Sequence, residues 1–355
     1  MEDLGMSSNF WQDKKIFLTG HTGFKGAWMS LWLHHLGAKV KGYALAPTTP
    51  FSLFELIGLA QFIESHIADV NDYQQLCASM EVYSPEIVFH FAAQAFVPAS
   101  YQKPLETLMT NAMGTTHVLE AARKIPSIRA VVIITTDKCY ENKEWVWPYR
   151  ENDALGGVDP YSASKACAEL VTAAYRQSFF DENKVGIATA RAGNVIGGGD
   201  FSIGRLIPDF IQSVQLNKPI YLRYPNAVRP WQHVLDPLNG YLLLAEELYN
   251  HPSQFSEAWN FGPDSQAIKT VSQVVEQLIT ISGKGSWERD TGNHPHESHD
   301  LKLDIHKAKE RLGWQPVLTI DEALERTNGW YDAWRRKENM LALTIDQLND
   351  FIRRK

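Results

Sequence analysis

A glycine-rich turn near the N-terminus constrains the fold more than any other feature. Its three glycines are Gly20, Gly23 and Gly26. Residues 15–19 before the turn have the composition of a short buried strand, and the apolar stretch 27–36 after it is typical of a helix that Gly37 ends. Such a turn between a strand and a helix lets the backbone approach a dinucleotide pyrophosphate at the positive end of the helix. The pattern predicts a Rossmann-type fold.

Candidate strands and helices alternate through the first half of the chain. Further strands are expected at residues 39–45, 86–91, 129–135 and 185–190. Continuous apolar runs such as 129–135 suit central parallel strands that are buried on both faces. After residue 195 the alternation weakens and turn signals multiply. We therefore expect an α/β, doubly wound parallel sheet that binds NAD in residues 1–194. A smaller C-terminal α/β substrate lobe is expected in residues 195–355, with some segments returning to the first domain and a last amphipathic helix from Leu341.

The composition is that of an ordinary globular enzyme. The chain has 355 residues, of which 44% are apolar and 21% charged, and a net charge of −7. That charge argues against a nucleic-acid surface. No secretion signal or membrane span is recognisable. Three cysteines, Cys77, Cys139 and Cys167, suggest neither a disulfide framework nor a metal site, so we expect the reducing cytosol. The histidines of residues 294–299 invite a metal interpretation, but Pro295 disfavours a helix there and a loop near the nucleotide is favoured.

Two groups of residues carry the expected chemistry. Thr136, Asp137 and Lys138 follow the apolar run 129–135, and ligands of such sheets bind at the carboxyl ends of the strands. Tyr161 and Lys165 are four residues apart, so on a helix they share one face. The lysine would favour the tyrosinate and lower the pKa of the phenol. A Tyr-x-x-x-Lys pair alone also fits a solvated helix face, but the glycine turn upstream favours catalysis.

The ribose-binding acid expected after the second strand is missing. Such an acid normally lies about 20 residues past the glycines. No Asp or Glu occurs between Lys25 and Phe54, and Ala44 stands near the expected position. No arginine is present there to hold a 2′-phosphate. NAD is therefore the expected cofactor, with only modest discrimination against NADP.

The motifs together resemble the nucleotide-sugar 4,6-dehydratases of the extended short-chain dehydrogenase/reductase superfamily. The matching motifs are Gly20-x-x-Gly23-x-x-Gly26, Asp69-Val70, Ala92-Ala93, Asn111, Thr136-Asp137, Tyr161-x-x-x-Lys165, Arg191-x-x-Asn194, Arg229-x-Trp231 and Leu312-Gly-Trp-x-Pro316. The resemblance spans roughly residues 14 to 340. Enzymes of this branch that act on dTDP-glucose have glutamate where this chain has Lys138, so Lys138 resembles the enzymes that act on CDP-glucose.

The resemblance implies a role for each matching residue. The cofactor-binding residues would be Gly20, His21, Gly23, Phe24, Gly26, Asp69, Val70, Ala92, Ala93, Asn111, Tyr161 and Lys165. The substrate-binding residues would be Asn194, Arg205, Arg229 and His299. The catalytic residues would be Thr136, Asp137, Lys138, Tyr161 and Lys165. No metal is expected.

The implied reaction converts CDP-glucose to CDP-4-keto-6-deoxyglucose, a step of deoxysugar biosynthesis such as that of lipopolysaccharide O-antigen. Tyr161 would deprotonate the sugar 4-hydroxyl, Thr136 would hydrogen-bond it, and Asp137 would protonate the leaving 6-hydroxyl. Lys138 would act either as the carbon 5 base or as an enolate-stabilising cation. Two alternatives remain: a 4-epimerase or another dehydratase of the superfamily, and a non-catalytic NAD sensor. A homodimer or a dimer of dimers is expected, formed through the Tyr161 helix and the helix after Asn111.

Overall fold

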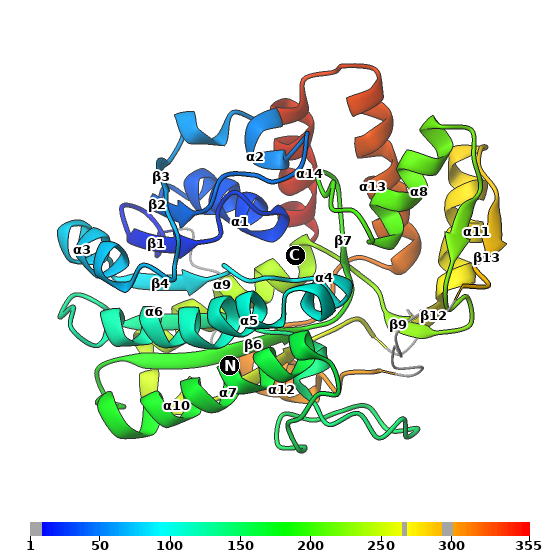
Figure 1. The fold of residues 1–355 in the computed structure, drawn as a ribbon. Coiled ribbons are helices and arrows are strands. Elements are labelled where there is room, and N and C mark those ends of the chain that lie inside the picture. The colour runs from blue at the N-terminus through cyan, green and yellow to red at the C-terminus, as the bar shows by residue number, and fades with distance from the viewer. Residues whose placement is uncertain (1–8, 265–267, 293–300) are drawn as a thin grey trace.

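The centre of the molecule is a parallel sheet of seven strands in the order β11-β6-β5-β4-β1-β2-β3 (Figure 1). The computed structural model describes residues 9–264, 268–292 and 301–355. The strands are β1 (Lys15–Thr19), β2 (Lys39–Ala44), β3 (Glu64–Ile67), β4 (Ile87–His90), β5 (Ala130–Ile134), β6 (Gly186–Ala192) and β11 (Ala258–Phe261). Helices connect and flank the strands, so the prediction of a doubly wound α/β fold is confirmed.

Apolar side chains cover both faces of the sheet, which explains why the central strand β5 is a continuous hydrophobic run. In β5, all five residues are buried. Val132 and Ile134 pack in one apolar cluster, whereas Val131 and Ile133 pack in a second one on the opposite face. Successive side chains of a strand alternate between faces, so each face needs its own cover.

Long helices supply that cover. They are α1 (Phe24–His35), α3 (Tyr73–Tyr83), α6 (Gly114–Ala122), α7 (Pro160–Phe179) and α9 (Leu235–Asn250). Residues of α1 and α9 belong to the larger cluster, with Trp28 and Leu242 among the fully buried ones. Residues of α3 and α6 belong to the smaller cluster, with Leu76 and Val118 fully buried. Shorter segments complete this half: α2 (Leu53–Leu56), η1 (Leu59–Gln61), α4 (Val97–Gln102), α5 (Pro104–Leu108), the π-helical turn η2 (Met109–Met113) and η3 (Asp137–Cys139).

The glycine-rich turn joins β1 to α1 as expected, although the helix begins earlier than residue 27 because Gly23 is its N-cap. Gly20 has a φ of +80°, which favours glycine. A Cβ on Gly26 would lie 2.0 Å from the carbonyl oxygen of Gly20. Only glycine therefore lets the first turn of α1 pack this closely against the end of β1.

The second half of the chain builds a smaller layer beside the sheet and also returns to it. β11 pairs with β6 at the edge of the large sheet. The remaining strands form two-stranded ladders: β7 (Val195–Ile196) with β10 (Gln232–His233), β8 (Ile220–Leu222) with β13 (Trp287–Arg289), and β9 (Val228–Pro230) with β12 (Ile268–Thr270). Around them lie α8 (Leu206–Gln215), α10 (Pro252–Phe255), α11 (Val271–Ser282), α12 (His306–Leu312) and α13 (Ile320–Arg335).

The last helix, α14 (Met340–Arg354), confirms the amphipathic helix expected from Leu341. Its Phe351 meets Trp32 of α1 edge to face, with ring centroids 5.7 Å apart, so the C-terminus covers the first helix of the chain (Figure 1). Among the helices within the described ranges, none is both long enough and apolar enough to cross a membrane.

Candidate active site

A cavity of about 320 Å³ lies at the carboxyl ends of β5 and β6. Residues 134–138 line one side and residues 192–197 another, while α7 contributes the Tyr161 and Lys165 side chains. Residues 204–209 and 220–224 of the smaller layer close the far side. The sequence-predicted residues that line the cavity are Ala93, Thr136, Asp137, Lys138, Tyr161, Lys165, Asn194, Arg205 and Arg229. Parallel sheets present their ligand sites at this edge.

Asp137 has the most unusual environment in the cavity. The carboxyl group is buried, and its Oδ1 accepts a hydrogen bond of 3.0 Å from the Thr136 hydroxyl. Its Oδ2 is buried without a hydrogen-bond partner among the described residues. A Cβ on Gly193 would lie 3.0 Å from that Oδ2, so a glycine there keeps space beside the acid. Burial raises the pKa of Asp137, against the lowering effect of Lys138 and of the Thr136 hydrogen bond.

Tyr161 and Lys165 lie on one face of α7, as predicted, and both are buried. Lys165 donates a 3.0 Å hydrogen bond from Nζ to the carbonyl oxygen of Ile134. The prediction that the pKa of Tyr161 is lowered is wrong for the protein without bound cofactor. Burial raises the pKa of Tyr161 to about 12, and hydrogen bonding with Thr136 opposes the rise only in part. Burial also lowers the pKa of Lys165 to about 8.

Asn111 braces the helix that carries the Tyr/Lys pair. It lies buried in η2, and its Nδ2 donates to Ser164 Oγ at 2.8 Å and to the Gln94 carbonyl at 2.9 Å. Its Oδ1 accepts from the Gln94 amide at 2.9 Å. These bonds tie the loop after β4 to the turn of α7 next to Lys165. Ala93 of that loop lines the cavity, whereas Ala92 is one of the residues that meet the tight Gly20 turn.

The structure shows where the His21 side chain packs, and its predicted contact with the cofactor stays a prediction. The ring is fully buried under β2, where its Nε2 lies 2.7 Å from Ser65 Oγ, and a Cβ on Gly42 would collide with it. Burial lowers the pKa of His21 to about 4, so the ring is neutral at physiological pH. The side chain therefore packs the turn onto the sheet and does not line the cavity described above.

The remaining cofactor-binding candidates surround the turn. Phe24 begins α1. Asp69 and Val70 follow β3: the Asp69 carbonyl accepts a bond of 3.3 Å from the Tyr43 hydroxyl, and Val70 packs against Gly114 at the start of α6. The start of α1 fits a diphosphate, because its N-cap Gly23 contributes no side chain and its first turn contains no acid.

Arg205 and Arg229 bring two guanidinium groups to the substrate side of the cavity. Arg205 Nη1 pairs with Asp200 Oδ2 at 2.9 Å, and its guanidinium lies over the Phe96 ring at 4.9 Å. Arg229 is buried in β9 and its charge helps to hold the pKa of Asp137 down. Asn194 follows β6 and also lines the cavity. His299, the fourth candidate, lies outside the described residues, as does the histidine stretch for which a metal was considered. Within the described ranges no group of potential ligands could hold a metal ion.

Lys25 is a site residue that was missed from the sequence. It is the second residue of α1, between Gly23 and Gly26, and lines the cavity. Burial lowers its pKa to about 7, with Arg205 and Lys165 adding to the effect and Asp137 opposing it. The sequence feature that could have indicated this role is a charged residue between Gly23 and Gly26 of the glycine motif. Cys139, next to Lys138, is fully buried in the larger apolar cluster.

The fold and the cavity define a Rossmann-type short-chain dehydrogenase/reductase with a Tyr/Lys pair at the strand ends. The family described as GDP-mannose 4,6 dehydratase matches residues 17–327. A CDP-glucose 4,6-dehydratase of Salmonella typhimurium is 52% identical over 98% of both chains. The chain therefore belongs to this family of nucleotide-sugar dehydratases.

Solved structures agree on the fold. The NAD complex of a dTDP-glucose 4,6-dehydratase from Bacillus anthracis superimposes with a TM-score of 0.77 at 23% identity, covering 92% of this chain and 99% of that one. A UDP-glucose 4-epimerase of Thermotoga maritima with UDP-glucose reaches a TM-score of 0.78 at 22% identity, covering 90% and 99%. At this level of identity, dehydratases and epimerases share the architecture, so the site residues must distinguish the reactions.

Proposed function

We propose that the protein is a CDP-glucose 4,6-dehydratase that produces CDP-4-keto-6-deoxyglucose and water. The observation that carries the proposal is Asp137, a buried carboxyl group in the same cavity as Tyr161, one of whose oxygens has no hydrogen-bond partner in the described part of the chain. Removal of the sugar 6-hydroxyl needs a proton donor, and burial favours the protonated form of this acid. The similarity to the Salmonella typhimurium enzyme supports CDP-glucose as the substrate.

The predicted catalytic and substrate-binding residues of the cavity each have a place in this reaction. The Tyr161 phenol, as phenolate, accepts the proton of the sugar 4-hydroxyl, and the Thr136 hydroxyl orients the same oxygen. Asp137 gives its proton to the departing 6-hydroxyl, while Lys138 faces carbon 5 as base or as enolate-stabilising cation. Arg205 and Arg229 bind the substrate diphosphate, because guanidinium matches phosphate oxygens bidentately. Asn194 supports the same group.

NAD is the cofactor in this proposal, and when bound it accepts the hydride from carbon 4 and returns it to carbon 6. The turn with Gly20, Gly23 and Gly26 holds the diphosphate, and Lys165 binds the nicotinamide ribose and stabilises the Tyr161 phenolate. The buried pair has pKa values of about 12 and about 8 from the protein's own groups, so the phenolate forms only when nearby positive charge offsets its burial. We also propose that residues 1–194 supply most cofactor contacts and 195–355 most substrate contacts.

A 4-epimerase is the second candidate, because an epimerase shares this fold. Epimerisation leaves the 6-hydroxyl in place and so needs no acid at the Asp137 position. A non-catalytic NAD sensor would not need Thr136, Tyr161 and Lys165 to converge in one cavity. The site therefore favours the dehydratase.

Conversion of nucleotide sugars by the purified protein tests the proposal. With NAD present, CDP-glucose should yield a product lighter by one water that develops the alkali-induced absorbance of a keto sugar. Substrate deuterated at carbon 4 should give product labelled at carbon 6. Formation of CDP-galactose with no loss of water would establish the epimerase, complete wash-out of deuterium would exclude internal transfer, and no turnover of any nucleotide glucose would favour the sensor.

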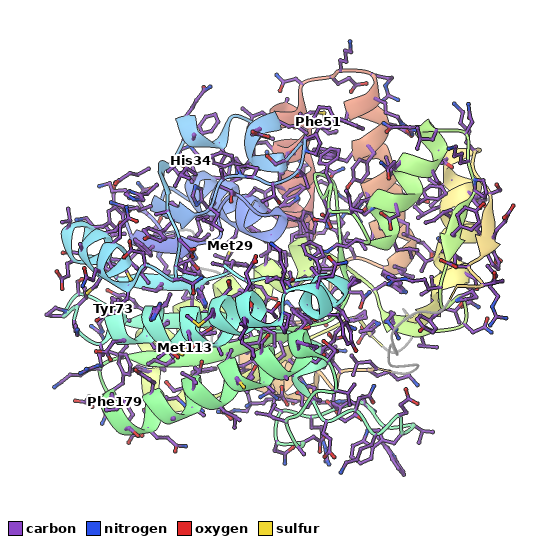
Figure 2. The ribbon with its side chains drawn as sticks, viewed as in Figure 1. Met29, His34, Phe51, Tyr73, Met113 and Phe179 are labelled. Atoms are coloured by element: carbon purple, nitrogen blue, oxygen red, sulfur yellow. The ribbon has the colours of Figure 1, made fainter. Side chains whose placement is uncertain are left out.

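The proposed assembly is a homodimer, or a dimer of dimers, formed through α5, η2 and α7. Several large apolar side chains on these segments are exposed: Leu105, Leu108, Met109, Met113 and Leu170. Figure 2 shows Met113 on this side of the molecule. Exposed large apolar side chains on neighbouring segments are typical of protein interfaces. The three cysteines are free thiols, in keeping with the reducing cytosol that we propose.

A further inference from the structure

Helix α7 carries a third buried functional group beyond Tyr161 and Lys165. Glu169 lies one helical turn after Lys165, on the same face, and its side chain is 2% exposed. Nothing in the proposed reaction uses this carboxylate. A buried charge is costly unless it is paired and hydrogen-bonded, so its partners indicate what it does.

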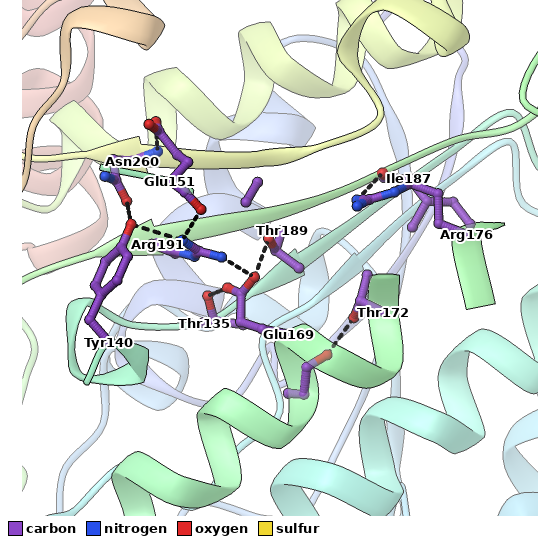
Figure 3. A network of polar contacts seen from close by, with 12 residues as sticks. Thr135, Tyr140, Glu151, Glu169, Thr172, Arg176, Ile187, Thr189, Arg191 and Asn260 are labelled. Carbon is purple, nitrogen blue, oxygen red and sulfur yellow. Dashed lines mark hydrogen bonds and ion pairs between the residues drawn. The ribbon is translucent and has the colours of Figure 1, made fainter. Parts of the chain in front are cut away.

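The Glu169 carboxylate accepts hydrogen bonds from three side chains, one directly after β5 and two in β6 (Figure 3). Thr135, directly after β5, donates its hydroxyl to Oε1. Thr189 of β6 donates its hydroxyl to Oε2 at 2.6 Å. Arg191 of β6 pairs with the same Oε2 through Nη2 at 2.8 Å, and the arginine side chain is 3% exposed. The carboxylate therefore joins α7 to β5 and β6.

Arg191 extends these contacts to a second point of the chain. Its Nη1 donates to the Tyr140 hydroxyl at 2.8 Å and to the Glu151 carbonyl at 3.0 Å. The guanidinium also lies 4.8 Å from the centre of the Tyr140 ring. The Tyr140 hydroxyl in turn donates to Asn260 Oδ1 at 2.7 Å. Figure 3 shows the two anchored residues, Thr135 and Tyr140, on one side of the ion pair.

The segment that carries the cavity residues is held at both of its ends. Residues 136–138, which carry the hydroxyl, the carboxyl and the amine of the cavity, lie between Thr135 and Tyr140 in the chain. Both flanking residues are fixed by one buried ion pair, and one member of that pair is on the helix of Tyr161 and Lys165. The pair thus sets the distance between the two halves of the site.

We propose that Glu169 and Arg191 are positioning residues that clamp the segment 135–140 against α7. The inference rests on the proposed dehydratase function, because it assigns Thr136 and Asp137 to the reaction. Arg191 has a second effect: it pairs with Glu169, and within the described ranges Lys165 then makes no direct ion pair with that carboxylate. Lys165 Nζ donates instead to the carbonyl oxygen of Ile134, the last residue of β5.

The ionised state of the pair supports this arrangement. Burial by itself raises the pKa of Glu169, but Arg191 and the two threonine hydroxyls lower it below its ordinary value. The carboxylate is therefore charged at neutral pH, and its charge opposes the lowering of the pKa of Lys165 by burial.

Two threonines allow a matched test. Thr135→Val and Thr189→Val each remove one buried hydroxyl donor from Glu169, but only Thr135 is adjacent to the reactive segment. Thr135→Val should lower kcat roughly 10- to 100-fold, as expected when reacting groups are displaced by a fraction of an ångström, with KM for CDP-glucose little changed. Thr189→Val should lower kcat less than about threefold. Thr135→Ser, which keeps the hydroxyl, should restore the rate.

Melting temperatures and the affinity for CDP, measured on all three variants, separate positioning from general loss of structure. Equal losses of kcat in the two valine variants, or no rescue by Thr135→Ser, would overturn the proposal. Tyr140→Phe tests the second anchor independently and should also lower kcat more than KM; unchanged kcat would contradict that anchor. Wild-type protein that does not dehydrate CDP-glucose would refute the proposed function instead, before any variant is compared.

Discussion

At the scale of single residues, the environment of Asp137 is the feature on which the proposed reaction rests. Within the ranges that the structure describes, the Thr136 hydroxyl donates to one carboxyl oxygen and the other has no hydrogen-bond partner. Burial raises the pKa of Asp137, which favours a proton donor over a carboxylate that pairs with Lys138. Lys138 and the Thr136 hydrogen bond oppose that rise. Bound substrate would exclude water from the cavity, and the added desolvation would raise the pKa of Asp137 further.

Asp137→Asn should block elimination more than oxidation, because only elimination needs the proton. In single turnover, the 4-keto sugar that retains its 6-hydroxyl should accumulate and the final product should form at least about 100-fold more slowly. Borodeuteride trapping followed by mass spectrometry measures both species. Equal slowing of oxidation and elimination would show that Asp137 has a structural role.

If Lys165 binds the cofactor as proposed, its titration should make cofactor use depend on pH. Burial lowers its pKa to about 8, so its charge is present below that pH and is lost above it. The value of kcat/KM for NAD should therefore fall as pH rises above about 8. Glu169→Gln removes the charge that opposes this lowering, so the fall should begin at lower pH.

A control variant distinguishes the titration of Lys165 from that of Lys25, whose pKa lies close to it. Lys25 has a pKa of about 7, and Lys25→Met removes its contribution to the profile. The shift caused by Glu169→Gln should persist in the Lys25→Met background. If the double variant had the same pH profile of kcat/KM as Lys25→Met alone, Glu169 would not act on Lys165.

At the scale of elements, α9 shows how a buried helix start is stabilised. Asp236 is the second residue of α9, and its Oδ1 accepts a 2.7 Å hydrogen bond from the Val317 amide. Its Oδ2 is buried without a partner among the described residues. Burial raises the pKa of Asp236 to about 7. The hydrogen bond thus connects α9 to the segment before α13, but burial makes the ionised form of Asp236 unfavourable.

Asp236→Asn should stabilise the protein above neutral pH. The folded state holds its proton up to about pH 7, whereas the unfolded chain releases it near pH 4, so stability is lost as pH rises through that window. Asparagine keeps an acceptor for the Val317 amide and cannot ionise. The free energy of unfolding should rise by roughly 1–3 kcal/mol at about pH 8 and change little at about pH 4.

Urea unfolding at both pH values measures the effect. Asp346→Asn, at an exposed position of α14, is the matched control and should leave the pH dependence as in the wild type. Destabilisation of Asp236→Asn at alkaline pH would contradict the expectation and indicate that the carboxylate is ionised and compensated in the fold.

At the scale of the whole molecule, the exposed apolar surface of α5, η2 and α7 predicts self-association. Leu170 of α7 is 59% exposed and Leu105 of α5 is 78% exposed. Sedimentation at low micromolar concentration should show at least a dimer of the 40.2 kDa chain. Leu170→Glu should shift the protein toward monomer, because a charge in an apolar interface lacks a partner.

Val82→Glu provides the control for that prediction. Val82 is 85% exposed on α3, away from the proposed interface, and its substitution should leave the assembly unchanged. A wild-type monomer that retains full activity would refute the proposed assembly, and equal effects of both substitutions would place the interface elsewhere.

The amino-acid sequence by itself determined the features that depend on neighbouring residues. The three-residue spacing of the glycines, the apolar run of β5 and the four-residue spacing of Tyr161 and Lys165 each predict local geometry, because strand, turn and helix repeat over a few residues. Those patterns also predict that Thr136 and Asp137 emerge at the ligand-binding edge of the sheet.

Only the tertiary structure decided what depends on distant contacts and burial. The Tyr140 hydroxyl meets Asn260 across 120 residues of sequence, and β11 returns to the sheet beside β6. The same packing turns the His21 ring away from the cavity and raises the pKa of Tyr161, which the sequence had predicted to be lowered. Desolvation has no signature in residue spacing, since it depends on which segments cover a group after the chain has folded.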